Sequence, residues 1–273
     1  MLGAICGDIV GSRFERKSIK NKDFEFFGKG CDFTDDTVMT CAVAAALLNH
    51  LQNHTDLSLD ATRYMQAYGR SFPTRHYGTS FAQWIGAKDP IPYNSWGNGA
   101  GMRVSPCGFL AKTLEEAKHY AKQVTQVTHN HPEGLKGAEA IATATFLAKV
   151  GYSKEEIRSY IDKHYYKLDF TLDEIRPTYD FNGSCQGSVP QAIECFLESI
   201  DFEDAIRNAI SLGGDSDTLG AMAGAIAEAH YGIPDSIKQK ILNEYLNDFL
   251  KRLVEAFYRK NSKNRWKIYR NLF

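Results

Sequence analysis

The sequence predicts an all-α protein, for three reasons. Apolar residues recur at spacings of three and four along most of the chain, which is the period of an amphipathic helix. Strand-like alternation is nearly absent, and the one candidate is a small hairpin around Phe24, Phe26 and the turn 28–30. No linker, repeat or low-complexity segment divides the 273 residues. We therefore expect a single all-α domain over residues 1–273.

Four helices are predicted before residue 130. Glycines at positions 3, 7 and 11 predict a close-packed helix at the N-terminus. The next two cover residues 36–51, where apolar side chains recur every three or four residues, and 59–72, where a proline follows. Residues 113–128 form the fourth. The long stretch 73–106, rich in glycine and aromatic residues, is predicted to be a functional loop.

The later helices follow from apolar runs and end signals. Residues 134–150 are alanine-rich and apolar on several sides, which predicts a central helix. Ser153 with Glu156 is a capping box, and Ser188 with Gln191 is another, with a proline at 190 tolerated in the first turn. Two glycines end the helix that begins at Asp201. The remaining predicted helices cover residues 153–164, 201–212, 218–231 and 236–260.

Composition and charge exclude several classes of protein. The net charge of −1 gives no electrostatic basis for binding nucleic acid or an anionic membrane. The basic C-terminal end is interpreted as the exposed side of a terminal helix, with residues Arg259, Lys260, Lys263, Arg265, Lys267 and Arg270. We find neither the basic start of a signal peptide nor an apolar run that spans a bilayer, and the six cysteines form no C-x-x-C pair. We expect a cytoplasmic monomer with reduced thiols.

Two segments with one pattern carry the strongest chemical signal. FTDDT, from Phe33, and GGDSDT, from Gly213, each place two carboxylates and a threonine before an alanine-rich helix. Helix capping explains one carboxylate in each, but two adjacent unpaired carboxylates repel, at a cost that burial increases. A divalent cation removes that cost. The predicted metal ligands are Thr34, Asp35, Asp36, Asp215, Asp217 and Thr218.

These six side chains all offer hard oxygen donors. That donor set favours Mg²⁺, Mn²⁺ or Ca²⁺ over zinc or copper. Four carboxylates suit two divalent ions better than one, which predicts a two-metal site. The small residues that follow each segment predict that the two helices approach closely and that their N-termini share the site.

Two further segments contain candidate ligand-binding residues. The segment 94–103, NSWGNGAGMR, has glycine at alternate positions and predicts a nest of backbone amides for a phosphate or pyrophosphate, although an ordinary flexible loop has the same pattern. In THNHPEG, His129 and His131 lie at a junction between helices. Two histidines without a third partner are weak evidence for a metal, so we expect hydrogen-bonding or structural roles.

Together these segments resemble the ADP-ribosylglycohydrolase family. The matching segments occur in the family's order and span most of the chain. They are GAICGDIVGSRFE (3–15), FTDDTVMT (33–40), GNGAGMRVSP (97–106), THNHPEG (128–134) and GGDSDTLGAMAGAIAEA (213–229). The sequence departs from the commoner pattern at Glu228, where many members have glycine, and this position is not one of the ligands.

The resemblance implies an all-α orthogonal bundle around a cleft with two Mg²⁺ or Mn²⁺ ions held by the same six oxygen donors. It implies an enzyme that hydrolyses the bond between the anomeric carbon of ADP-ribose and a protein side chain, by attack of a metal-oriented water. Glu15 matches the family glutamate near the scissile bond. The residues that match the substrate-binding positions are Gly97, Asn98, Gly99, Met102 and His129.

The sequence leaves alternatives open. The acid that accepts a proton is Asp35, Asp36 or Glu15. The substrate is an ADP-ribosylated protein, through arginine, serine or another side chain, or a free ADP-ribosyl metabolite such as O-acetyl-ADP-ribose. A non-catalytic family member and a phosphohydrolase of the pyrophosphate are the other interpretations. The presence of all six predicted ligands argues against the non-catalytic one, and product analysis separates the phosphohydrolase.

Overall fold

A computed structural model describes the backbone of residues 1–270 and the side chains of residues 1–261. Within that part of the chain the secondary structure is helical, and the β-type pairing consists of one isolated bridge between Gly97 and Ser184. The prediction of an all-α fold is confirmed. The predicted hairpin is wrong, because Phe24 packs edge-to-face on Phe14 and lies under the Arg207 guanidinium in an irregular segment.

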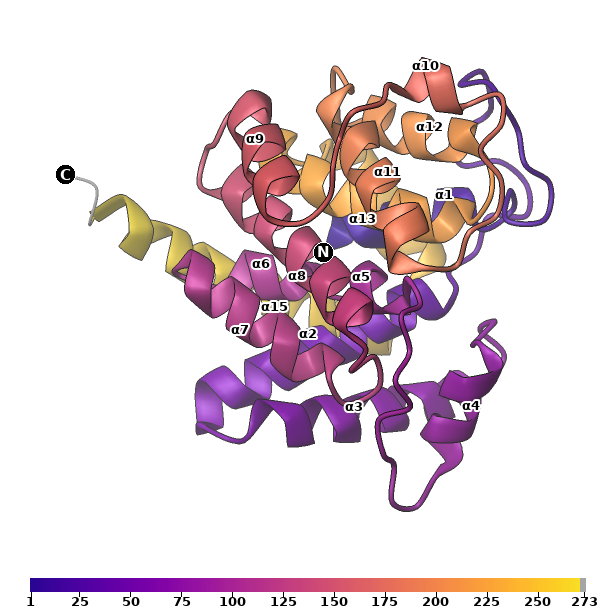
Figure 1. Cartoon of the computed structure of the whole chain (residues 1–273). Coiled ribbons are helices and arrows are strands. Elements are labelled where there is room, and N and C mark those ends of the chain that lie inside the picture. The colour runs from indigo at the N-terminus through magenta and orange to yellow at the C-terminus, as the bar shows by residue number, and fades with distance from the viewer. Residues whose placement is uncertain (271–273) are drawn as a thin grey trace.

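Figure 1 shows α8 and α13 in the middle of the bundle, with α3 and α4 along its lower side and α10 and α12 at the top. In chain order the helices are α1 (Leu2–Gly11), α2 (Asp35–Asn53), α3 (Leu57–Ser71), α4 (Thr79–Gly86), α5 (Gly99–Met102), α6 (Ser105–Leu110), α7 (Leu114–Thr125), α8 (Pro132–Lys149), α9 (Lys154–His164), α10 (Leu172–Ile175), α11 (Cys185–Leu197), α12 (Phe202–Leu212), α13 (Ser216–Tyr231), α14 (Asp235–Lys240), the π-helix η1 (Ile241–Tyr245) and α15 (Asp248–Arg270).

Most predicted helices are confirmed, with ends set by capping. The Thr34 side chain accepts the Asp36 amide at the start of α2, and Asp201 accepts the Asp204 amide at the start of α12. The capping box of Ser153 and Glu156 is present at α9. Such caps satisfy backbone donors that the first turn of a helix leaves unpaired.

Three predictions are corrected. The segment 73–106 is not one long loop, since it contains α4, α5 and the start of α6. Helix α11 begins before the predicted box at Ser188, because the Ser184 side chain caps it by accepting the Gly187 amide, and Pro190 lies inside the helix. The predicted helix 236–260 is interrupted at η1 and resumes as α15. Local propensity did not indicate these breaks.

Helix α13 is the centre of the bundle and packs along α1, with α8, α11 and α12 also against it. Glycines make the α1–α13 contact possible. A Cβ atom built on Gly7 would lie 1.9 Å from the carbonyl oxygen of Gly220, and one on Gly3 would lie 2.1 Å from that of Gly224. The small residues of α13 therefore pack against α1. The prediction that α13 and α2 pack closely along each other is wrong. Helix α2 packs mainly on α3.

All six cysteines are free, and all but Cys31 are buried. None of the helices in the described part of the chain is long and apolar enough to cross a membrane. Of the basic residues predicted on the terminal helix, Arg259 is exposed, and the side chains from Lys263 onward lie outside the described residues.

We expect Gly7→Ala to lower the free energy of unfolding by about 3 kcal/mol, because its methyl group meets backbone that cannot rotate away. Urea unfolding followed by circular dichroism measures the change. Gly86→Ala is the matched control, since a Cβ there meets nothing within 4 Å. We expect that control to shift stability by less than about 0.5 kcal/mol. Equal effects of the two substitutions would contradict the close approach of α1 and α13.

Candidate functional site

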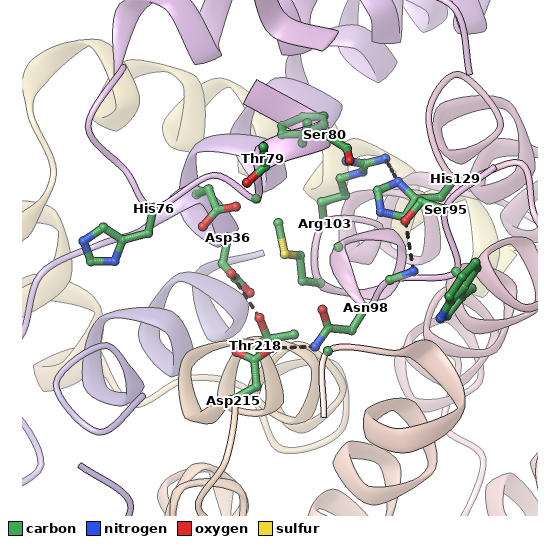
Figure 2. Close-up of a pocket in the computed structure, with 18 of the residues that line it drawn as sticks. Asp36, His76, Thr79, Ser80, Ser95, Asn98, Arg103, His129, Asp215 and Thr218 are labelled. Atoms are coloured by element: carbon green, nitrogen blue, oxygen red, sulfur yellow. Dashed lines mark hydrogen bonds between the residues drawn. The ribbon is translucent and has the colours of Figure 1, made fainter. Parts of the chain in front are cut away.

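A cavity of about 610 Å³ opens where the N-terminal ends of α2 and α13 meet the segment around α5. Figure 2 shows Asp36, Asp215 and Thr218 together on one side of it, with Arg103 and His129 on another. Most of the site residues predicted from the sequence line this cavity. They are Glu15, Asp35, Asp36, Gly97, Asn98, Gly99, Met102, His129, Asp215, Asp217 and Thr218.

Hydrogen bonds join the two acidic segments across the fold. The Thr218 hydroxyl donates to Oδ2 of Asp36 at 3.3 Å, so the starts of α13 and α2 are in direct contact. The side-chain amide of Asn98 donates to Oδ2 of Asp215 at 2.7 Å, which links the segment at α5 to the same group. The two segments therefore lie together at one cavity, and their joint role as a metal site stays a prediction.

The turn before α13 needs glycine. Gly213 and Gly214 have φ of 73° and 72°, in the left-handed region that side chains disfavour. Gly213 ends α12, and two residues later Asp215 stands at the N-cap position of α13. The turn therefore places Asp215 and Asp217 at the cavity within one tight reversal of the chain.

Sequence reasoning missed Asp8, a fully buried carboxylate on α1. It accepts the Thr34 hydroxyl at 2.7 Å, the Thr34 amide at 3.0 Å and the Thr37 amide at 2.9 Å. Asp8 thus fixes the first turn of α2. The signal was present in the sequence, because an acid between Gly7 and Ile9 interrupts an otherwise apolar helix.

Thr34 is the one predicted ligand that does not line the cavity. Its hydroxyl donates to Asp8, and the same oxygen accepts the Asp36 amide at 3.3 Å. Donating its proton to Asp8 leaves this hydroxyl as an acceptor on its other side. Its role as a ligand stays a prediction.

Ionising these carboxylates costs free energy, because they are removed from water and lie close to one another. Burial, followed by the nearby charge of Asp8, raises the pKa of Asp35 to about 8. Burial and the charge of Asp217 raise the pKa of Asp36 well above its usual value, and burial and Asp215 do the same for Asp217. Burial also raises the pKa of Asp8 to about 6, although its hydrogen bonds act in the opposite direction. Several acids with raised pKa values therefore lie close together, and the described residues around them do not supply as many positive charges.

This environment fits hard divalent cations. Oδ1 of Asp36 is buried and has no hydrogen-bond partner, so one oxygen of the group lacks the contact that a buried carboxylate needs. The surrounding donors are carboxylate and hydroxyl oxygens, the set that Mg²⁺ and Mn²⁺ accept. Among the described residues, no three His, Cys, Asp or Glu side chains lie close enough together to hold a metal ion.

The predicted nest of amides around α5 is corrected. The Gly97 amide donates to the Ser95 hydroxyl, and the Asn98 amide donates to the Gly183 carbonyl at 2.8 Å. The amides of Ala100 and Gly101 donate to carbonyls within the same turn. Of these backbone donors, the Gly99 amide alone has no acceptor within the described part of the chain, so the segment offers far fewer free N–H groups than the glycine pattern suggested.

The two histidines have different environments. His131 caps α8 by accepting the Glu133 amide, and its ring contacts Trp96, which confirms a structural role. His129 is buried at the cavity wall, with Nδ1 at 2.8 Å from the Thr128 hydroxyl and 3.3 Å from Nη2 of Arg103. Arg103, which sequence reasoning did not select, is therefore part of this wall.

Glu15 lies at the rim of the cavity, beyond the C-terminal end of α1. Its Oε2 is 3.8 Å from Nδ1 of His76, and its side chain is 22% exposed. His76 has a positive φ of 64°, an uncommon conformation for a residue with a side chain. This partly exposed acid thus lies beside a histidine with an uncommon backbone conformation.

The sequence profile of ADP-ribosylglycohydrolase matches residues 1–265. The chain belongs to the ADP-ribosylglycohydrolase family. It is 27% identical to ADP-ribosylhydrolase ARH3 of Homo sapiens, over 96% of this chain and 93% of that protein. It is 26% identical to ADP-ribosylarginine hydrolase Tri1 of Pseudomonas putida, over 93% of this chain and 76% of that protein.

The fold agrees with this assignment. A solved structure titled ADP-ribosylglycohydrolase-related protein complex superposes with a TM-score of 0.69 and covers 95% of each chain, at 24% identity.

Glu228, the position that departs from the commoner family pattern, lies outside the cavity lining. Its carboxylate accepts the Gly3 amide at 2.7 Å and the Tyr258 hydroxyl, so it ties α1 and α15 to α13.

We expect the raised pKa of Asp35 to make the metal-free protein less stable as the pH rises from 7 to 8.5. An unfolded aspartate has a pKa of about 3.9. The folded chain therefore retains a proton that the unfolded chain has lost, and the free energy of unfolding falls as the pH rises through about 8.

Thermal unfolding in EDTA at the two pH values measures this effect. Asp35→Asn is the control, because it removes the titrating group and should flatten the dependence. Asp35→Asn with the same loss of Tm as the unsubstituted protein would contradict the assignment of the dependence to Asp35.

Proposed function

We propose that this protein hydrolyses the glycosidic bond between the anomeric carbon of ADP-ribose and a protein side chain. One observation carries the proposal. Two acidic segments far apart in the sequence meet in a single cavity, where the Thr218 hydroxyl donates a hydrogen bond to Asp36. Membership of the ADP-ribosylglycohydrolase family supports the reaction class. The cavity volume of about 610 Å³ is in the range that suits a ligand of this size.

The acidic end would hold two Mg²⁺ or Mn²⁺ ions. The ligands would be the four carboxylates and two hydroxyls predicted from the sequence: Thr34, Asp35, Asp36, Asp215, Asp217 and Thr218. Bound there, the ions would supply Lewis acidity that makes water nucleophilic at neutral pH. Asp8 would orient Thr34 for this role, because it accepts the hydrogen bond from the Thr34 hydroxyl and so leaves that oxygen as an acceptor on its other side.

The chain's own groups account for the remaining requirements of the reaction. Hydrolysis at an anomeric carbon passes through an oxocarbenium-like transition state. The water oxygen bonds to this carbon while the bond to the side-chain atom breaks, so a carboxylate must take the proton of the water and the leaving side chain must receive one. Asp35 and Glu15 line the cavity and are the candidates, with Asp36 more deeply placed. The wall around Gly97–Gly99 and His129 would bind the diphosphate part of the substrate. Binding energy gained there would fix the position of the reacting carbon.

We expect Asp35→Asn to lower kcat by at least about 100-fold while the fold is kept, since it removes a charged oxygen from the reacting end. The assay uses ADP-ribosyl-arginine and ADP-ribosyl-serine peptides with Mg²⁺ or EDTA, and identifies products by mass. Asp89→Asn is the matched control, because Asp89 is exposed and lies outside the cavity. Full activity of Asp35→Asn would overturn the site assignment.

The products separate the proposed reaction from its competitors. Metal-dependent release of intact ADP-ribose supports glycohydrolysis and names the linkage. Release of AMP would indicate cleavage of the pyrophosphate. Turnover of O-acetyl-ADP-ribose with no release from either peptide would make a free metabolite the substrate. Binding of ADP-ribose without any turnover would identify a non-catalytic member.

A further inference from the structure

Arg103 is a buried cation without a buried anion beside it. Its side chain is 1% exposed, and no carboxylate oxygen of residues 1–261 lies within ion-pair distance of its guanidinium. Nη2 donates to the Thr128 hydroxyl at 2.6 Å, and the group lies 5.4 Å from the centre of the Phe81 ring. Its Nε is buried without a partner. Taking such a charged group out of water costs free energy, so we expect its buried position to serve a function.

The guanidinium determines which nitrogen of His129 carries the proton. Nη2 of Arg103 lies 3.3 Å from Nδ1 of His129, and arginine has donors but no acceptor. A proton on Nδ1 would face this donor, so the guanidinium favours an accepting Nδ1. The Thr128 oxygen accepts from Arg103, and its own proton has two acceptors within reach: Nδ1 of His129 at 2.8 Å and the Thr125 carbonyl at 3.4 Å. The shorter contact is the one to Nδ1. A neutral imidazole with an accepting Nδ1 carries its proton on Nε2.

Electrostatics favour the neutral ring. Burial and the nearby charge of Arg103 lower the pKa of His129 well below its usual value. Burial lowers the pKa of Arg103 to about 10, so the guanidinium remains charged at neutral pH. The pair is one fixed cation and one neutral ring. Among residues 1–261, the hydrogen-bonding partners of the ring lie at Nδ1, on the side of the guanidinium.

The free side of the ring faces the glycine segment. A Cβ built on Gly99 would lie 3.3 Å from Nε2 of His129, and one built on Gly97 would lie 3.6 Å from it. Side chains at these positions would crowd the Nε2 proton. The Gly99 amide, for which residues 1–261 supply no acceptor, lies on the same segment. Figure 2 shows the ring of His129 held by Arg103 at this wall of the cavity.

We propose that Arg103 is a positioning residue that holds His129 in its Nε2–H tautomer, so that this proton is offered to a phosphate oxygen of the ligand at the Gly97–Gly99 wall. The identity of that ligand rests on the proposed function. Arg103 also places a positive charge behind the ring, which strengthens the ring as a donor. The reacting end, at Asp35 and Asp36, is not altered by this role.

The tautomer is measured without any ligand. Full-length protein labelled with ¹⁵N-histidine gives two-bond ¹H–¹⁵N correlations that distinguish the two neutral tautomers and the charged ring, and His129→Gln assigns the signal. We expect the Nε2–H pattern at pH 7.5. A proton on Nδ1, or a charged ring at that pH, would overturn the proposal whatever the protein hydrolyses.

Variants test the consequence for binding. We expect Arg103→Met to yield a mixture of tautomers and to weaken ADP-ribose binding about tenfold, measured by calorimetry, with KM raised more than kcat is lowered. Arg103→Lys keeps a charged donor and should restore part of the affinity. Arg207→Met is the matched control, since Arg207 also packs on aromatic rings but lies outside the cavity.

The outcomes keep the two proposals apart. Unchanged ADP-ribose affinity in a folded Arg103→Met or Arg103→Lys protein that has lost the Nε2–H pattern would overturn the role in binding. A wild-type protein with the Nε2–H pattern and no affinity for ADP-ribose would support the positioning by Arg103 and overturn the proposed function.

Discussion

The contact between α1 and α13 is the constraint on which the rest of the structure depends. Glycines on both helices allow their backbones to touch, with space for no Cβ at Gly7. Helix α1 carries Asp8, which fixes the first turn of α2, while α13 begins with Asp217 and Thr218. The distance between the two acidic segments is therefore set by this backbone contact together with the hydrogen bonds of the buried Asp8 side chain. A site that must place several oxygen donors accurately gains from so rigid a support.

Three carboxylates at the site, those of Asp8, Asp36 and Asp215, are held by groups from other parts of the chain. Asp8 receives two amides and a hydroxyl from the start of α2, Asp36 receives the Thr218 hydroxyl, and Asp215 receives the Asn98 amide. These donors offset part of the cost of burying the acids, but the raised pKa values indicate that the offset is incomplete without an added cation. The residual cost is what a bound ion would remove.

The sequence predicted what local patterns encode. The position of both acidic segments at helix starts, the glycine turn and most helices were predicted correctly, because end signals and 3.6-residue periodicity are properties of short stretches. Contacts between distant segments were not predictable in this way. The small residues of α13 indicated close packing but not that α1 is the partner, and Arg103 gave no local sign of its contact with His129. The glycines at 97 and 99 suggested free amides, whereas they leave room for an imidazole.

The position of Arg103 has a consequence for orientation. One wall of the cavity carries its guanidinium, and the facing end carries Asp35, Asp36 and Asp217, whose raised pKa values disfavour the charged form. An elongated ligand with an anionic middle and a neutral sugar end meets a fixed positive charge when its anionic middle lies at Arg103 and its sugar lies at the acids. The guanidinium therefore favours one direction of entry over the reverse before any hydrogen bond forms.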